Sequence, residues 1–399
     1  NIGLGNHQRA VIENGNWIGN LACVDYTYAE NGLLPGWRNG GIVSQYTCMK
    51  LAAATGTKLV PGAAAPGTCR GIYPIPGTPD MALLERVFAE TLFCGAHATN
   101  GPWGLRGEAG GEAPAYLRNQ SLRSNTRELA AAFTRLMPDF DQSTDAAAVG
   151  ILYSLDAMLG DEPRSRQAVD AMAQLLMQHQ IPFRFVLSDN MATAEGLKLL
   201  ILPHVLPVGD DLADKLREFV AADGCLLVTG RTSLHDETMR QRRNYALADV
   251  LGHDFSRTFE EENLDNLLCN PVNGCCFMPG EWPFTGPDGK PACGVPEAAI
   301  VAAVRDTTAD ALVPWVESPV RSVIAECRQT ADGRLLLGLI DYADSSAGTV
   351  EIVFGDTVTV ARIQAHALIG EAPQVEQSGL GTFRLPVPKT PLFLTMEMD

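Results

Sequence analysis

Apolar and polar positions along residues 149–230 alternate between strand-like and helix-like patterns without interruption. Four short, continuously apolar runs, at 149–153, 181–187, 199–205 and 225–229, are typical of buried parallel strands. Between them, apolar residues recur at the three- and four-residue spacing of a helix that covers one face of a sheet. That spacing is carried by Val169, Met172, Leu175 and Leu176, and then by Leu212, Leu216, Phe219 and Val220. The order predicts an open parallel sheet with helices on both faces.

The first 144 residues alternate similarly but have longer loops. The pattern predicts strands at 21–28, 57–63 and 92–98, and helices at 42–54, 79–90 and 124–136. Each strand is followed by a loop rich in Gly, Pro, Asn and aromatic residues, and a (β/α)₈ barrel keeps its active site in such loops. Three βα units cannot close a barrel. The segment is therefore either a small open sheet or the C-terminal portion of a barrel whose first part is not in this sequence.

Short alternating runs follow an irregular, Cys- and Pro-rich stretch and predict an antiparallel sandwich. The predicted strands are 320–326, 335–341, 349–354, 357–363, 381–387 and 392–396. The fold class is thus a multidomain α/β protein. Its predicted domains are barrel units over 1–144, a flavodoxin-like sheet over 145–252, an irregular connection over 253–310 and a β-sandwich over 311–399.

Charge and targeting signals narrow the possible partners. A formal charge of -17 opposes binding to nucleic acid or to an anionic membrane surface. No apolar run approaches the length of a membrane span, and no signal peptide is visible at the N-terminus, so we expect a cytoplasmic protein. The chain begins at Asn1 without an initiator methionine, which fits a processed chain or a fragment.

Ten cysteines do not form a disulfide scaffold in a chain of 399 residues. Cys269, Cys275, Cys276 and Cys293 could be a metal site, but adjacent cysteines rarely both bind one zinc ion, and no CxxC pair occurs. We expect no metal. Free thiols and a local disulfide both remain open for these four residues.

Three stretches carry a resemblance to a known family: the Leu-Leu-Ile-Leu-Pro run at 199–203, Gly-Cys-Leu-Leu-Val-Thr-Gly at 224–230, and Leu-Ile-Asp-Tyr at 339–342. In this order they resemble the C-terminal part of family 42 β-galactosidases and of related α-L-fucosidase-like glycosidases. The resemblance extends from about residue 145 to the end of the chain and only weakly over the first 140 residues. It implies a β-galactosidase trimerisation domain, and hence a homo-oligomer, dimer or trimer.

The trimerisation domain in turn resembles class I glutamine amidotransferases in fold. Amidotransfer needs a nucleophilic cysteine on a sharp turn from a strand into a helix, with a histidine and a carboxylate nearby. Here Gly230 is followed by Arg231, Thr232 and Ser233, and His204 has no acid close to it in sequence. We therefore interpret this domain as non-catalytic.

Glycoside hydrolysis needs two carboxyl groups that flank the scissile bond. The resemblance places them on the fourth and seventh barrel strands, and that pair cannot be mapped onto this sequence. The best-placed acids are Asp25, within the first predicted strand, and Glu30, just after it, near Trp37. The alternative interpretation is a hydrogen-bonding strand-end acid and a solvated loop glutamate.

A second candidate group follows the predicted strand at 92–98. The side chains of His97, Asn100, Trp103 and Arg106 offer a stacking ring and hydrogen-bond donors within ten residues, which suit the hydroxyl groups of a sugar. Trp103 could instead only plug the mouth of a barrel.

The sequence thus predicts a glycoside hydrolase acting on a neutral sugar, a galactoside or fucoside, without a cofactor. The alternative is a non-catalytic carbohydrate-binding or oligomerisation module. A nucleotide cofactor is not supported, because no glycine-rich phosphate-binding motif follows any predicted strand.

Overall fold

The computed structural model describes residues 26–30, 35–44, 46–56, 58–62, 81–95, 120–255, 268–270, 272–278, 297–343 and 347–398. For 26–30, 58–62, 81, 83–84, 120–126 and 162–163 it describes the backbone alone. The chain forms two compact units. The sandwich unit comprises residues 1–146, 177–182 and 312–399, and the open-sheet unit comprises 147–176 and 183–311.

The open-sheet unit contains a six-stranded sheet in the order β10-β11-β9-β8-β6-β7. Its strands are β6 (Val149–Tyr153), β7 (Phe183–Leu187), β8 (Leu199–Pro203), β9 (Cys225–Thr229), β10 (Leu268–Cys269) and β11 (Cys276–Met278). Every neighbouring pair is parallel except β10 with β11, which is antiparallel. The four strands predicted from apolar runs are therefore present, and the edge pair was not predicted.

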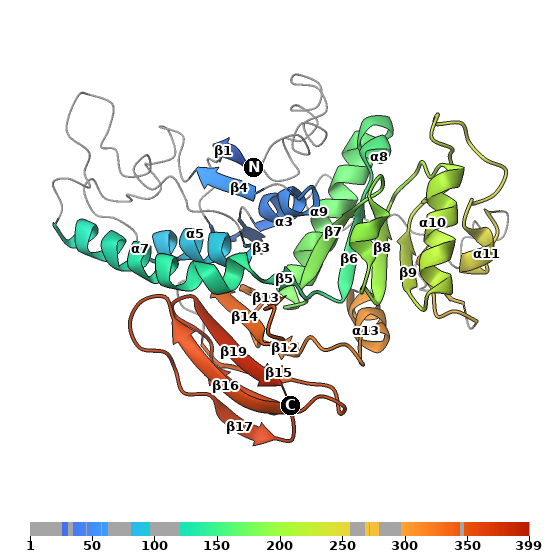
Figure 1. Ribbon diagram of the computed structural model, residues 1–399. Helices are drawn as coiled ribbons and strands as arrows, with labels where there is room; N and C mark the ends of the chain where they lie inside the picture. Colours follow the sequence, from blue (N-terminus) through green and yellow to red (C-terminus); the bar gives the residue numbers. More distant parts are fainter. Residues whose placement is uncertain are drawn as a thin grey trace, which may run out of the picture. The chain divides into compact units, whose positions relative to one another are not determined.

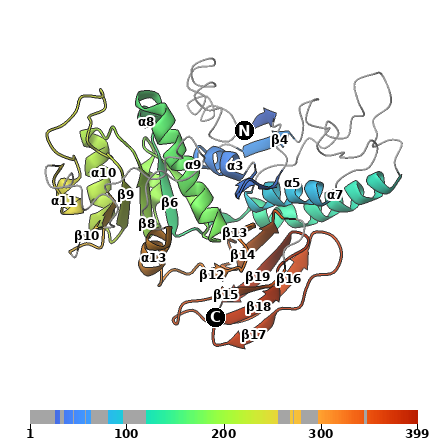
Figure 2. The same ribbon diagram turned by 180° about the vertical axis from the view of Figure 1, so that it is seen from behind.

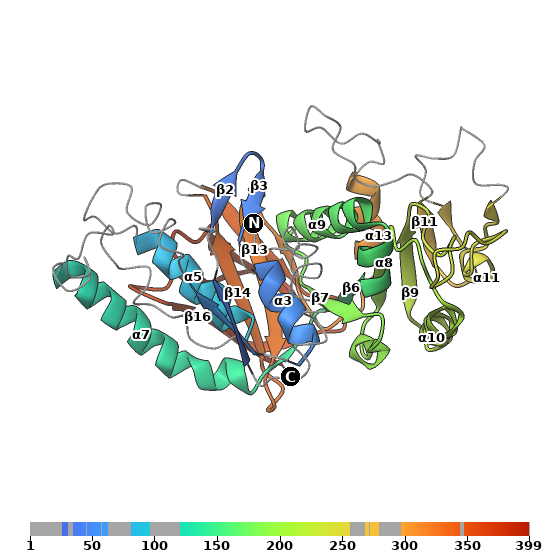
Figure 3. The ribbon, with the colours of Figure 1, turned by 90° about the horizontal axis from the view of Figure 1, so that it is seen from above.

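Helices cover both faces of this sheet, as the alternating pattern predicts. They are α8 (Leu155–Gly160), α9 (Glu162–Gln178), the 3₁₀ helix η3 (Met191–Ala194), α10 (Asp210–Ala221), α11 (Ala248–Leu251) and α13 (Glu297–Thr307). Figure 3 shows α9 and α10 on opposite faces. The α10 face encloses a core that includes Leu200, Leu226 and Phe277.

A disulfide joins Cys269 and Cys276, which lie directly opposite each other on β10 and β11. Of the two alternatives for these cysteines, free thiols or a local disulfide, the structure contains the disulfide for Cys269 and Cys276. Cys275 remains a free, buried thiol, and burial raises its pKa to about 11. Cys293 lies outside the described residues. Among the described residues, no three His, Cys, Asp or Glu side chains gather as metal ligands.

The sandwich unit packs two antiparallel sheets face to face. One has the order β12-β15-β18-β17 and the other β16-β19-β14-β13-β5. The strands are β5 (Thr144–Asp145), β12 (Trp315–Glu317), β13 (Val323–Gln329), β14 (Leu335–Asp341), β15 (Thr349–Val353), β16 (Val360–Ala367), β17 (Glu376–Gly379), β18 (Thr382–Pro386) and β19 (Leu392–Met398). Alternate residues such as Leu337, Ile352 and Leu394 meet between the sheets.

The N-terminal part of the chain belongs to this same unit. It contains β1 (Tyr26–Glu30), β2 (Gly36–Arg38), β3 (Gly41–Val43), α3 (Tyr46–Ala54), β4 (Lys58–Gly62), α5 (Met81–Phe93) and α7 (Gln120–Asp141). Strands β1 and β4 pair in parallel, and β2 and β3 form a hairpin. Figures 1 and 2 show α5 and α7 lying over the sheet that contains β14 and β19.

One predicted element in this part is wrong, and another begins later than predicted. The predicted strand at 92–98 begins inside a helix, because Leu92 and Phe93 are the last residues of α5 and Cys94 lies in the turn after it. Phe88 and Leu92 stand one helical turn apart, so this apolar run continues the buried stripe of the helix. The predicted helix at 42–54 begins only at Tyr46, after β3.

One glycine allows α5 to approach the sheet. A Cβ atom at Gly338 of β14 would lie 2.3 Å from Phe93 Cδ2. The Phe93 ring in turn stacks on Phe140 of α7, with centroids 5.7 Å apart, and Phe140 meets the edge of Phe393 on β19. A side chain at Gly338 would displace this aromatic group.

No described helix is long and apolar enough to span a membrane.

We therefore predict that Gly338→Ala lowers the free energy of unfolding by about 1–3 kcal/mol, because the added methyl group overpacks the contact with Phe93. Urea unfolding followed by circular dichroism measures the change. Gly379→Ala is the matched control, since the nearest atom to a Cβ there is 3.6 Å away. Equal stability of the Gly338 variant and wild type would contradict the packing argument.

Candidate functional site

The first predicted acid that the structure describes lies at the end of a strand. Glu30 is the last residue of β1, and its backbone is in register with Gly62 at the end of β4. The two strands are parallel, so their carboxyl ends meet at one edge, and α3 lies between them in the chain. Asp25 lies outside the described residues. The backbone therefore puts Glu30 where a βαβ unit presents functional side chains.

Trp37 lies on the hairpin β2–β3 and is half-buried. Its backbone N–H donates a hydrogen bond to the carbonyl oxygen of Tyr342, at 2.9 Å. The Tyr342 hydroxyl donates to Glu90 Oε1 at 2.6 Å, so the hairpin is held at the end of β14 beside α5. His97, Asn100, Trp103 and Arg106 lie outside the described residues.

Sequence reasoning missed a cluster of buried charges in the sandwich unit. We call Tyr46, Lys50, Asp145 and Glu326 the buried charge cluster. Lys50 Nζ lies 2.7 Å from Asp145 Oδ2 and 2.5 Å from Glu326 Oε1, and the Tyr46 hydroxyl donates to Glu326 Oε2. Lys50 is 3% exposed and Glu326 is 1% exposed.

The cluster forms because α3, β5 and β13 present their polar side chains to the same place. Tyr46 and Lys50 are four residues apart on α3 and share a face. Glu326 lies on β13 between Ala325 and Cys327, which point into the core of the sandwich. Glu326 therefore points out of that core. The signal in the sequence was a single lysine in a largely apolar helix and a glutamate within the apolar first half of a strand.

Burial and neighbouring charges shift the pKa values in the cluster. Burial raises the pKa of Glu326 to about 7, although Lys50 opposes the shift. Burial alone would lower the pKa of Lys50, but Asp145 and Glu326 outweigh it and the pKa is raised. Burial, followed by the charge of Glu326, raises the pKa of Tyr46. With its charges enclosed, the cluster is suited to holding α3 and β13 together rather than to meeting a substrate.

We predict that Lys50→Met lowers the free energy of unfolding by about 3–5 kcal/mol, because it leaves two carboxylates without their buried counter-charge. The loss should be larger at pH 8 than at pH 5. The folded pKa of Glu326 exceeds its unfolded value of about 4.3, so stability falls as the pH rises between the two, and removing Lys50 raises the folded pKa further. Urea unfolding at both pH values measures this.

Lys389→Met removes an exposed lysine of the same unit and should leave stability unchanged. The double variant Lys50→Met with Glu326→Gln should recover part of the loss, because one unpaired carboxylate is gone. A Lys50→Met loss below about 1 kcal/mol would show that the cluster is not a stabilising ion pair.

The open-sheet unit has its own polar group at the carboxyl ends of its strands. Strand order reverses between β6 and β8, the position where open α/β sheets bind ligands. Asp161 follows α8, and its Oδ2 lies 3.0 Å from Nε2 of His204, which follows β8. His204 is fully buried and has φ +52°. The sequence shows no acid close to His204, because the carboxylate that pairs with it lies 43 residues earlier in the chain.

The segment after β9 closes this edge. The N–H of Ser233 donates to Val205 O, that of His235 to Leu206 O, and that of Val208 back to His235 O, at 3.0–3.2 Å. Gly230, at the turn where an amidotransferase would carry its nucleophile, has φ +65°, and a Cβ there would lie 2.5 Å from His204 Nδ1. The turn thus lacks both a nucleophile and room for one, which supports the non-catalytic interpretation of this unit.

The hydrogen bond from His204, and further the charges of Arg164 and His235, hold the pKa of Asp161 below its usual value against the effect of burial. We predict that Asp161→Asn lowers the free energy of unfolding by about 1 kcal/mol at pH 7. The difference should vanish as the pH falls through the depressed pKa of Asp161, because the wild-type carboxylate is then protonated too. Thermal unfolding from pH 7 to pH 3, with exposed Glu237→Gln as control, measures it; a difference that persists at pH 3 would contradict the assignment.

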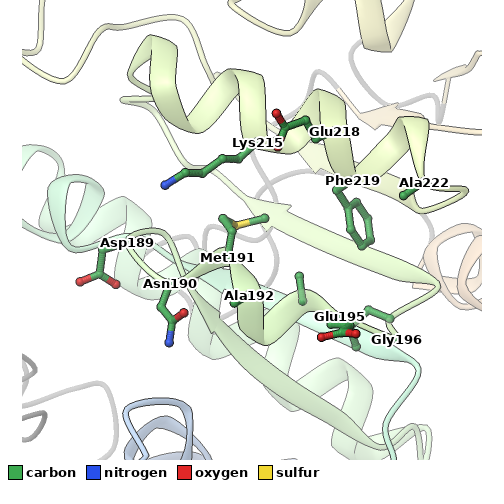
Figure 4. A pocket seen from close by; sticks show the side chains of 12 residues that line it. Asp189, Asn190, Met191, Ala192, Glu195, Gly196, Lys215, Glu218, Phe219 and Ala222 are labelled. Carbon is green, nitrogen blue, oxygen red and sulfur yellow. The ribbon is translucent and has the colours of Figure 1, made fainter.

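A groove of about 730 Å³ opens on the α10 face of the open-sheet unit. Its walls are η3 with its flanking turns and the outer side of α10, and Figure 4 shows Met191 and Phe219 pointing into it from opposite walls. The polar side chains around them are Asp189, Asn190, Glu195, Lys215 and Glu218. Gly224 makes room for the ring of Phe219, because a Cβ there would lie 2.4 Å from Phe219 Cε1.

The sequence of this unit matches a family model described as the beta-galactosidase trimerisation domain over residues 153–268. Over these residues the chain is similar to that domain, and we call this segment the trimerisation domain. The trimerisation domain contains β7, β8, β9, α10, the closed strand edge and the groove. No curated protein matches the chain by sequence.

Solved structures of β-galactosidases share the fold of the whole chain. The enzyme from Rahnella sp. R3 matches with a TM-score of 0.59 and 12% identity, over 96% of this chain and 62% of its own. The enzyme from Bacillus circulans sp. alkalophilus gives 0.61 and 12% over the same shares. A GH42 β-galactosidase from G. stearothermophilus, a catalytic mutant, gives 0.55 and 12% over 96% and 61%.

This chain therefore spans about three fifths of the length of these relatives. The trimerisation domain and the shared fold confirm the predicted resemblance to family 42. They give no support to its fucosidase-like part.

Proposed function

We propose that this chain is part of a glycoside hydrolase of the family 42 type that acts on galactosides. The observation that carries the proposal is the fold shared with β-galactosidases over 96% of the chain, together with the trimerisation domain. We propose galactosides rather than fucosides because these relatives are β-galactosidases.

We infer that the N-terminal elements are the end of a (β/α)₈ barrel. The parallel pair β1 and β4, connected through α3, is the arrangement from which such barrels are built. In the sandwich unit these elements accompany α5, α7 and the two antiparallel sheets. The proposed domain order is thus barrel end, trimerisation domain and β-sandwich.

In this proposal Glu30 is one of the two carboxyl groups and Asp25 is the candidate for the other. Glu30 is supported by its position at the carboxyl end of a parallel strand. One group would protonate the leaving oxygen while the other, ionised, attacks the anomeric carbon or activates water. Trp37, His97, Asn100, Trp103 and Arg106 would line the sugar site. The reaction requires no cofactor.

Assembly is the second part of the proposal. We propose that the trimerisation domain joins copies of this chain into a homotrimer. The match to the trimerisation-domain family model supports this role. The two proposals are independent: a result that contradicts the homotrimer leaves the hydrolase proposal intact, and the reverse also holds.

We predict that Glu30→Gln lowers kcat for 4-nitrophenyl β-galactoside about 10²–10⁴-fold in the natural polypeptide that contains this chain, with KM little changed. The amide keeps the shape of the side chain but can neither give nor take the proton. Glu376→Gln, on the exposed strand β17, is the control and should keep full activity. Unchanged kcat in Glu30→Gln would remove it from the mechanism, and a wild-type polypeptide that cleaves no galactoside would favour the non-catalytic module.

A further inference from the structure

The disulfide of the open-sheet unit lies at the outer edge of its six-stranded sheet. Cys269 is on β10, the edge strand, and Cys276 is directly opposite it on β11. The bond closes a short covalent loop, because the two cysteines are seven positions apart in the sequence. Since β10 has only two residues, its backbone pairing with β11 is short. The disulfide therefore adds a covalent link where the edge of the sheet has few hydrogen bonds.

The turn inside this covalent loop is tied to the short helix α11. The side-chain amides of Asn270 and Asn273 both donate to the carbonyl oxygen of Val250, each at 2.8 Å. That oxygen belongs to the last turn of the helix, where carbonyl groups have no partner within the helix. Gly252, which follows α11 with φ +69°, leaves room for Asn270. We call the disulfide and these two hydrogen bonds the disulfide clip.

The contacts of the clip continue from α11 to α10. Asp249 Oδ2 on α11 lies 2.8 Å from Arg217 Nε on α10. Arg217 Nη2 also donates to the carbonyl oxygen of Ala246, just before α11, at 2.6 Å. Figure 2 shows β10, α11 and α10 at the same end of the sheet. The clip thus holds a helix that also anchors α10, so opening the clip would loosen this end of the unit.

The two cysteines of the clip differ in their exposure to solvent. Cys269 is exposed, whereas Cys276 is only 7% exposed. Thiol–disulfide exchange begins when a thiolate attacks one of the two sulfur atoms, and its rate depends on access to that atom. Cys275 points into the core on the α10 face, and burial raises its pKa to about 11, so it does not compete as a thiolate. A small thiol from solution therefore reaches the Cys269 sulfur first.

We propose that Cys269 is a site of reversible modification by small thiols, and that this modification opens the clip on α11. The thiolate attacks Cys269 Sγ, the bond to Cys276 Sγ breaks, and Cys276 leaves as a thiolate that takes up a proton from water. The product is a mixed disulfide on Cys269 and a free thiol on Cys276. A dithiol completes the reduction, because its second thiolate releases Cys269 and the dithiol becomes a cyclic disulfide.

Tandem mass spectrometry tests which sulfur is attacked. The protein is incubated with reduced glutathione, quenched in acid, and alkylated in denaturant before digestion without reductant. Glutathione should be found on Cys269 and the alkyl group on Cys276, about ten times more often than the reverse. Equal labelling of the two cysteines, or a preference for Cys276, would overturn the assigned site. Alkylation of both cysteines in untreated protein would overturn the clip itself.

Hydrogen exchange tests whether modification opens the clip. Reduction by dithiothreitol should speed exchange of the amides in residues 247–252 and 272–278 about tenfold, and leave β6 and β8 unchanged. The double variant Cys269→Ser with Cys276→Ser should exchange rapidly in both segments with or without dithiothreitol. Cys48→Ser, which removes a free, half-buried thiol of the sandwich unit, is the matched control and should respond to dithiothreitol as wild type does.

Two results of this experiment would count against the proposal. Unchanged exchange in residues 247–252 after reduction, with both thiols free by mass, would overturn the coupling between the disulfide and α11. A double variant whose exchange in these segments still responds to dithiothreitol would show that another disulfide controls them.

Discussion

The sandwich unit depends on one buried ionic interaction, in which the Lys50 ammonium lies between the carboxylates of Asp145 and Glu326. These three residues are far apart in sequence, on α3, β5 and β13. Without the lysine, two carboxylates would be buried against each other. Without the acids, α3 would bury an unpaired charge. Neither side of the contact is tolerable alone, so the helix of the N-terminal part and the sheet of the C-terminal part must come together.

This constraint fits the burial of β14 and most of β13 on both faces. One face of β13 and β14 packs against the other sheet through Ala325, Leu337 and Leu339. The other face carries Glu326 and Gly338, which meet α3 and α5. An isolated sandwich would keep one face polar. Because the outer face of β13 and β14 is also buried, helices from a distant part of the chain must pack against it.

Much of the fold could be predicted because its elements obey local periodicity. Strands β6 to β9 are apolar runs, interrupted in β7 by Arg184, and the stripes of α9 and α10 have helical spacing. Prediction failed at Leu92 and Phe93, where a short apolar run fits a strand and a helix end equally well. The contacts of Lys50 with Glu326 and of Asp161 with His204 could not be predicted, because they join residues whose proximity only the tertiary fold determines. In the proposed sugar site, the sequence pointed to Glu30 because it lies at the end of a predicted strand. The residues that face Glu30 could not be identified, because no local sequence pattern marks them.

The two candidate regions of the open-sheet unit, the carboxyl ends of its strands and the groove on the α10 face, differ in how accessible they are. At the strand ends, residues 230–242 occupy the crevice, Gly230 replaces any nucleophile, and the His204–Asp161 pair is turned into a buried structural contact. A ligand there would have to displace backbone hydrogen bonds. The α10 face is different, because η3 and α10 line an open groove whose polar rim is exposed. The edge of the sheet where open α/β folds bind small ligands is thus closed, while the groove on the α10 face stays open.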